Sequence, residues 1–235
     1  KVADGTLARY KPEWKSNGIQ IDDLYMVSPY WVRKSAHLGE SKYLDLAIKE
    51  TLSYYKHLWN PQTKLMHCLW LEKKPEALIP HWGRGNGWFV MGITDLLHFV
   101  PEKHPKRAEL LEIYNNVMLG LMARQNKDGL WHQVLDHPES YTETSCTGMF
   151  TYSLLHGSAK GWLPESARTA GLKGWNGLQT KLNDKNQLID VCVGTDMSEN
   201  IQYFLERPRV THDQHGIGPF LLAAAEEIKL KSNKL

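Results

Sequence analysis

A recurring turn pattern limits the possible folds of this chain more than any other feature of its sequence. Short polar turns, each followed by an apolar or aromatic pair, return about every 60 residues, which is the sign of a repeat architecture. These turns begin at Asp4, Asn60, Asn126 and Asn183. Apolar residues at helical spacing fill the segments between them, and no alternating segment of useful strand length is present. We therefore predict an all-α fold that is built from helical hairpins.

The expected helices follow from this spacing and from residues that favour helix ends. Ser28-Pro29 predicts an N-cap and a first helical residue, and Gly39 predicts the end of that helix. Ser41 is expected to cap the next helix. The expected helices are 30–38, 41–58, 105–121, 165–182 and 218–230, with a further one directly after Asn86-Gly87.

The number of repeats suggests an incomplete ring. Each repeat buries its apolar face only against its neighbours, so an array of hairpins must close on itself or be capped. A chain of 235 residues holds roughly four units, whereas a closed ring of such hairpins has about six. We expect residues 1–235 to form a single domain, the C-terminal two-thirds of the ring. A preceding segment or a second chain would supply the N-terminal hairpins.

Composition excludes several classes of function. The net charge is +2, and no basic stripe indicates a nucleic-acid surface. No run approaches the roughly 18 apolar residues of a membrane span. Three widely spaced cysteines indicate neither a disulfide framework nor a metal site. The nine Trp and ten Tyr residues suit a sugar-binding cleft, although such residues also occur in ordinary cores.

The stretch 81–91, HWGRGNGWFVM, is the first candidate for function. Trp82 and Trp88 flank Arg84, and Asn86 is expected to be the N-cap of the following helix. An indole stacks well on a pyranose ring, and a guanidinium binds a carboxylate through two hydrogen bonds, so the group suits a sugar acid. The alternative is a buried tryptophan pair with an arginine that holds the loop.

Asp22 and Asp23 are the second candidate. They lie at an expected loop–helix junction among apolar residues, where burial would raise the pKa of a carboxyl group and suit it for general acid catalysis. The alternative is that one of them caps the helix or pairs with Arg33. A metal at His212 and His215 is not expected, because no further ligand stands at suitable spacing.

Several stretches together resemble the unsaturated rhamnogalacturonyl hydrolases of glycoside hydrolase family 105 and the related unsaturated glucuronyl hydrolases of family 88. The resemblance covers about residues 4–226. The stretches that carry it are 21–26 with Pro29, 82–91, 129–136, 143–150 and 215–223. It implies an (α/α)6 toroid and a reaction without a cofactor, in which an aspartic acid protonates C4 of a terminal Δ4,5-unsaturated uronate and water adds at C5.

The resemblance also implies roles for individual residues. Asp23 matches the acid, because Met stands three residues after it and Pro six residues after it. The subsite for the unsaturated ring corresponds to Trp82, Arg84, Gly85 and Trp88. His67 matches a histidine near the double bond; by itself it would be read as a core residue. The family's second aspartate belongs to an earlier hairpin and has no counterpart here, and the loop at 9–11 departs from the family pattern.

Two other functions remain open from the sequence. An inverting glycosidase on the same fold would use two carboxylates separated by a water molecule. A non-catalytic toroid would bind the sugar without converting it. The expected partner in each case is an oligosaccharide rather than a nucleic acid or a membrane, and the compartment stays open between bacterial cytoplasm and periplasm.

Overall fold

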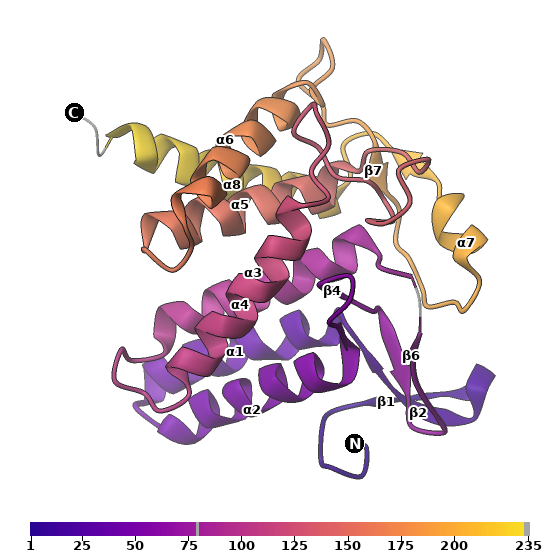
Figure 1. Ribbon diagram of the computed structural model, residues 1–235, viewed down its shortest axis with the longest axis vertical. Coiled ribbons are helices and arrows are strands. Elements are labelled where there is room, and N and C mark those ends of the chain that lie inside the picture. Colours follow the sequence, from indigo (N-terminus) through magenta and orange to yellow (C-terminus); the bar gives the residue numbers. More distant parts are fainter. Residues whose placement is uncertain (79, 233–235) are drawn as a thin grey trace.

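The computed structural model describes residues 1–78 and 80–232, and helices dominate this part of the chain (Figure 1). The all-α prediction is confirmed: three helical hairpins are followed by a short helix and a long one. The helices are α1 (Asp23–Leu38), α2 (Ser41–Leu58), α3 (Gly83–Phe99), α4 (Arg107–Met122), α5 (Thr144–Ala159), α6 (Glu165–Gln179), α7 (Ile201–Leu205) and α8 (Gln214–Ser232).

The long helices form two rows. Helices α1, α3, α5 and α8 contact one another in that order, and α2, α4 and α6 each pack against the helix that precedes them. Helix α3 is buried along nearly its whole length, whereas α2 is amphipathic and buries only one side, including Ile48, Tyr54 and Leu58. The core therefore lies between the rows. At one point α5 and α8 approach so closely that a Cβ on Gly148 would lie 2.9 Å from Cβ of Pro219.

Short strands gather where α1 and α3 begin. A four-stranded antiparallel sheet has the order β1 (Arg9–Lys11), β2 (Ser16–Gln20), β5 (Leu69–Leu71) and β6 (Lys74–Leu78). Strand β2 leads into α1, and β6 precedes α3 (Figure 1). Two small pairs complete the strands: β3 (Trp59–Asn60) with β4 (Leu65–Met66), and β7 (Val191–Cys192) with β8 (Arg209–Val210).

Several helix starts differ from the prediction: α4 begins at Arg107 rather than 105, α8 begins at Gln214 rather than 218, and α1 and α3 also differ. Helix α1 begins at Asp23, so Pro29 lies inside it rather than at its first position. Helix α3 begins at Gly83, so Arg84 belongs to its first turn rather than to a loop, and Asn86 is not its N-cap. The end of α1 is confirmed, because Gly39 caps it in the left-handed conformation with φ of +69°.

None of the helices formed by the described residues combines the length and the apolar character needed to cross a bilayer.

Candidate active site

The N-terminal ends of α1 and α3 meet beside the sheet, and this contact brings the two candidate stretches together. A Cβ on Gly85 would lie 2.8 Å from Cγ2 of Ile21 and 3.0 Å from Cε3 of Trp82. One turn further along both helices, the rings of Tyr25 and Trp88 lie 4.9 Å apart between centroids. Glycine at position 85 is thus required for close packing, and the packing places the residues next to Ile21 and Gly85 near each other.

Asp22 is the residue after Ile21; it is half-buried, and one oxygen of its carboxyl group is enclosed by protein. Oδ2 accepts a hydrogen bond of 3.3 Å from Nε2 of Gln20. Oδ1 is buried and accepts no hydrogen bond from the described residues. Burial raises the pKa of Asp22 to about 6, while hydrogen bonds from its own backbone and from Gln20, and the charge of Arg84, act in the opposite direction.

Asp23 has different surroundings. Its carboxylate forms a two-point ion pair with Arg9, including a bond of 2.7 Å from Nε to Oδ2. The Arg9 side chain is 57% exposed and that of Asp23 is 16% exposed, and the pair lies beside a cavity of about 320 Å³ that Met26 and Tyr54 also line. The carboxyl group with the raised pKa and no ion pair is therefore that of Asp22, whereas the sequence analysis expected the acid at Asp23. Neither of them pairs with Arg33, which binds Asp95.

Arg84 is 1% exposed, and its guanidinium is already bound by protein. Nη1 donates to the carbonyl oxygen of Cys192 and Nη2 to that of Val193, each at 2.7 Å. The guanidinium also lies 4.8 Å from the ring centroid of Trp82. Of the two interpretations of this arginine, the structure favours the one in which it holds a loop. Its charge still acts on Asp22.

The two tryptophans differ in accessibility. Trp82 is 1% exposed and packs against Phe204, with 6.1 Å between ring centroids. Trp88 is only half-buried. Of the two, Trp88 is therefore the one whose face is partly open to a sugar ring.

His67 and Asn86 belong to one hydrogen-bonded arrangement next to α3. His67 is 8% exposed, stacks on His81 with 4.5 Å between centroids, and lies 3.2 Å from Nδ2 of Asn60. Asn86 binds both the N–H and the carbonyl of Met66 at 2.9 Å, so it fixes the strand that precedes His67. The sequence analysis expected a helix cap at Asn86, because asparagine in Gly-Asn-Gly is typical of one.

Glu143 accepts hydrogen bonds from several backbone N–H groups. The sequence analysis included it in the stretch 143–150 but assigned it no role. It is fully buried at the N-cap of α5 and accepts hydrogen bonds from the N–H groups of Ser145 and Cys146. It also accepts one of 2.9 Å from the N–H of Cys192, the residue whose carbonyl binds Arg84. An acidic residue directly before a long apolar stretch is the signal that could have identified this cap.

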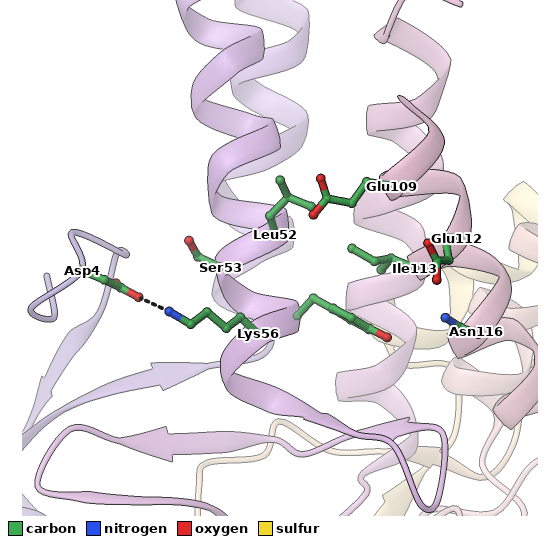
Figure 2. A pocket seen from close by; sticks show the side chains of 9 residues that line it. Asp4, Leu52, Ser53, Lys56, Glu109, Glu112, Ile113 and Asn116 are labelled. Atoms are coloured by element: carbon green, nitrogen blue, oxygen red, sulfur yellow. Dashed lines mark ion pairs between the residues drawn. The ribbon is translucent and has the colours of Figure 1, made fainter. Parts of the chain in front are cut away.

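Other cavities and titratable clusters lie away from this site. Figure 2 shows one of about 610 Å³ between α2 and α4, where Asp4 pairs with Lys56 and Glu109 and Glu112 face the opening. Within residues 1–78 and 80–232, no group of three His, Cys, Asp or Glu side chains is arranged to hold a metal ion.

Comparisons with known proteins identify the family and the fold of the chain. A family model described as Glycosyl Hydrolase Family 88 matches residues 1–231. The unsaturated 3S-rhamnoglycuronyl hydrolase of Alteromonas sp. (strain LOR) is 27% identical over 215 residues, which cover 87% of this chain and 50% of that protein. The chain thus spans about half the length of this relative.

Solved structures share the fold. A glycoside hydrolase from family 105 of C. acetobutylicum ATCC 824 is 29% identical, with a TM-score of 0.83 over 89% of this chain and 64% of that one. A possible family 105 member from Salmonella enterica serovar Paratyphi A has a TM-score of 0.92 at 23% identity, over 98% of this chain and 62% of that one. The predicted toroid class of helical hairpins is confirmed by these matches.

Proposed function

We propose, from the premise that the chain belongs to Glycosyl Hydrolase Family 88, that its site removes a terminal Δ4,5-unsaturated uronate from oligosaccharides. The carboxyl group of Asp22 is the single observation that supports this most. Asp22 is half-buried, its Oδ1 accepts no hydrogen bond from the described residues, and burial raises its pKa to about 6. Such a group is half protonated near pH 6 and can then give its proton to carbon.

The reaction assigned to Asp22 is the hydration of a vinyl ether. Its proton moves to C4 of the unsaturated ring, and the hydroxyl of a water molecule adds to C5. The resulting hemiketal opens and releases the sugar to which the uronate was bound. The carboxylate takes the second proton of the water, so the acid is regenerated and no cofactor is consumed.

The other candidate residues take supporting roles in this proposal. Arg84 stabilises the carboxylate that Asp22 becomes, because its buried charge favours the ionised form. Trp88, which is half-buried, offers a face for the sugar ring. His67 precedes Cys68, whose carbonyl accepts a hydrogen bond of 3.0 Å from the N–H of Ile21, beside Asp22. Trp82 and Gly85 are fully buried and shape the site through packing.

The substrate class is supported by the name of the Alteromonas relative, an unsaturated 3S-rhamnoglycuronyl hydrolase. An unsaturated uronyl disaccharide and its saturated counterpart therefore form the matched pair for an assay. We expect the protein to remove the ultraviolet absorbance of the conjugated double bond and to release the second sugar, and to leave the saturated disaccharide intact.

Two results would contradict the proposal. Cleavage of both disaccharides at similar rates would indicate a conventional inverting glycosidase, which has no need of the double bond. Binding of the unsaturated disaccharide with constant absorbance over hours would indicate a sugar-binding protein.

A further inference from the structure

A buried lysine is connected to the candidate acid through a single glutamine. Lys11 in β1 and Gln20 in β2 are 8% and 5% exposed, although both side chains are polar. Nζ of Lys11 donates a hydrogen bond of 2.6 Å to Oε1 of Gln20. Nε2 of Gln20 donates one of 3.3 Å to Oδ2 of Asp22. The three groups therefore form one continuous line of hydrogen bonds.

The sheet is built to admit this lysine. Strands β1 and β2 pair antiparallel, and the stem of Lys11 crosses Gly18, where a Cβ would lie 3.1 Å from Cγ of Lys11. A buried ammonium group is unfavourable unless a polar group compensates for the lost water. The amide oxygen of Gln20 provides that compensation.

The donors and acceptors of these groups determine how the Gln20 amide is oriented. An ammonium group has three donors and no acceptor, so only the amide oxygen of Gln20 faces Lys11 favourably. The amide group is planar, and its NH₂ end is consequently turned toward Asp22. Lys11 thus determines which end of Gln20 the carboxyl group meets.

We propose that Lys11, acting through Gln20, positions the Asp22 carboxyl group by binding its Oδ2. Lys11 and Gln20 are positioning residues in this account, which rests on the proposed role of Asp22.

The titration of Asp22 tests this without requiring activity. Protein labelled with ¹³C in the aspartate carboxyl carbons is titrated by NMR, and the resonance absent from the Asp22→Asn variant is assigned to Asp22. We expect a midpoint near pH 6 in the wild type. In Gln20→Leu and Lys11→Met the midpoint should rise by about one pH unit, because the carboxylate loses a donor or the charge that orients it.

Two further variants make the test specific. Lys11→Arg keeps a charged donor and should restore the wild-type midpoint. Lys15→Met removes an exposed lysine near the same strands and should leave the midpoint unchanged. A wild-type midpoint in folded Gln20→Leu and Lys11→Met would overturn the positioning role, as would a raised midpoint in Lys15→Met.

The two proposals fail in different experiments. Failure of the wild-type protein to consume the unsaturated disaccharide contradicts the proposed function, whatever the titration shows. Unchanged titration midpoints contradict the role of Lys11 and Gln20, even where the wild type is active. In an active protein, Gln20→Leu should lower kcat more than it raises KM, because the side chain acts on the acid rather than on the bound sugar.

Discussion

Asp22→Asn is expected to lower the turnover of an unsaturated uronyl disaccharide by about 10²- to 10⁴-fold, the usual contribution of a general acid. An amide cannot release a proton to carbon, yet it fills the same space. Asp23→Asn is the matched control, because it makes the same chemical change one residue away, in a carboxylate that pairs with Arg9. Turnover in Asp23→Asn should stay within a few-fold of wild type. The assignment is contradicted when Asp23→Asn is the slow variant and Asp22→Asn is not.

The free energy of unfolding of Asp22→Asn shows whether its low turnover comes from the lost proton donor or from a damaged fold. The pKa of Asp22 is raised in the folded protein from 3.8 to about 6. The protonated group therefore favours folding below about pH 4, and this contribution is lost as the pH rises through about 6. Asn stays neutral, so the variant should be more stable than wild type at pH 8, on the order of 2–3 kcal/mol. The difference should vanish at pH 4 in urea unfolding experiments.

Glu143→Ala is expected to lower the free energy of unfolding by about 3–5 kcal/mol, because several buried donors lose their common acceptor. The change leaves the N–H groups of Ser145, Cys146 and Cys192 without their acceptor. It also loosens the segment that binds Arg84, because Cys192 both donates to Glu143 and accepts from Arg84.

Chemical denaturation with a matched surface variant measures this effect. Glu139 is exposed and contacts His137, so Glu139→Ala should leave the unfolding midpoint unchanged. Equal midpoints for Glu143→Ala and Glu139→Ala would show that the buried carboxylate does not hold α5 and the 192–195 segment together.

The helical hairpins could be predicted from the sequence because their signals are local. Apolar residues at helical spacing identified 41–58 as α2, and Gly39 marked the end of α1. The start of α3 could not be read in this way. Asn86 resembles a cap, but its side chain binds the backbone of Met66, a contact that depends on tertiary structure.

The strands and the identity of the acidic residue could not be predicted from the sequence, for related reasons. Strands of two to five residues are too short to show alternation, and their pairing depends on distant residues, such as Gly18 with Leu71. Asp22 and Asp23 are adjacent and equivalent in a sequence pattern. Only the packing of Ile21 against Gly85 and the position of Arg9 distinguish the carboxyl group without an ion pair from the paired one.

The dependence of kcat/KM on pH, measured by the loss of double-bond absorbance, tests the role of Asp22 most directly. Because the acid must be protonated in the free enzyme, kcat/KM should fall as the pH rises through about 6, approaching tenfold per pH unit above it. A value that stays level from about pH 5 to about pH 8, or rises through that range, would contradict the account.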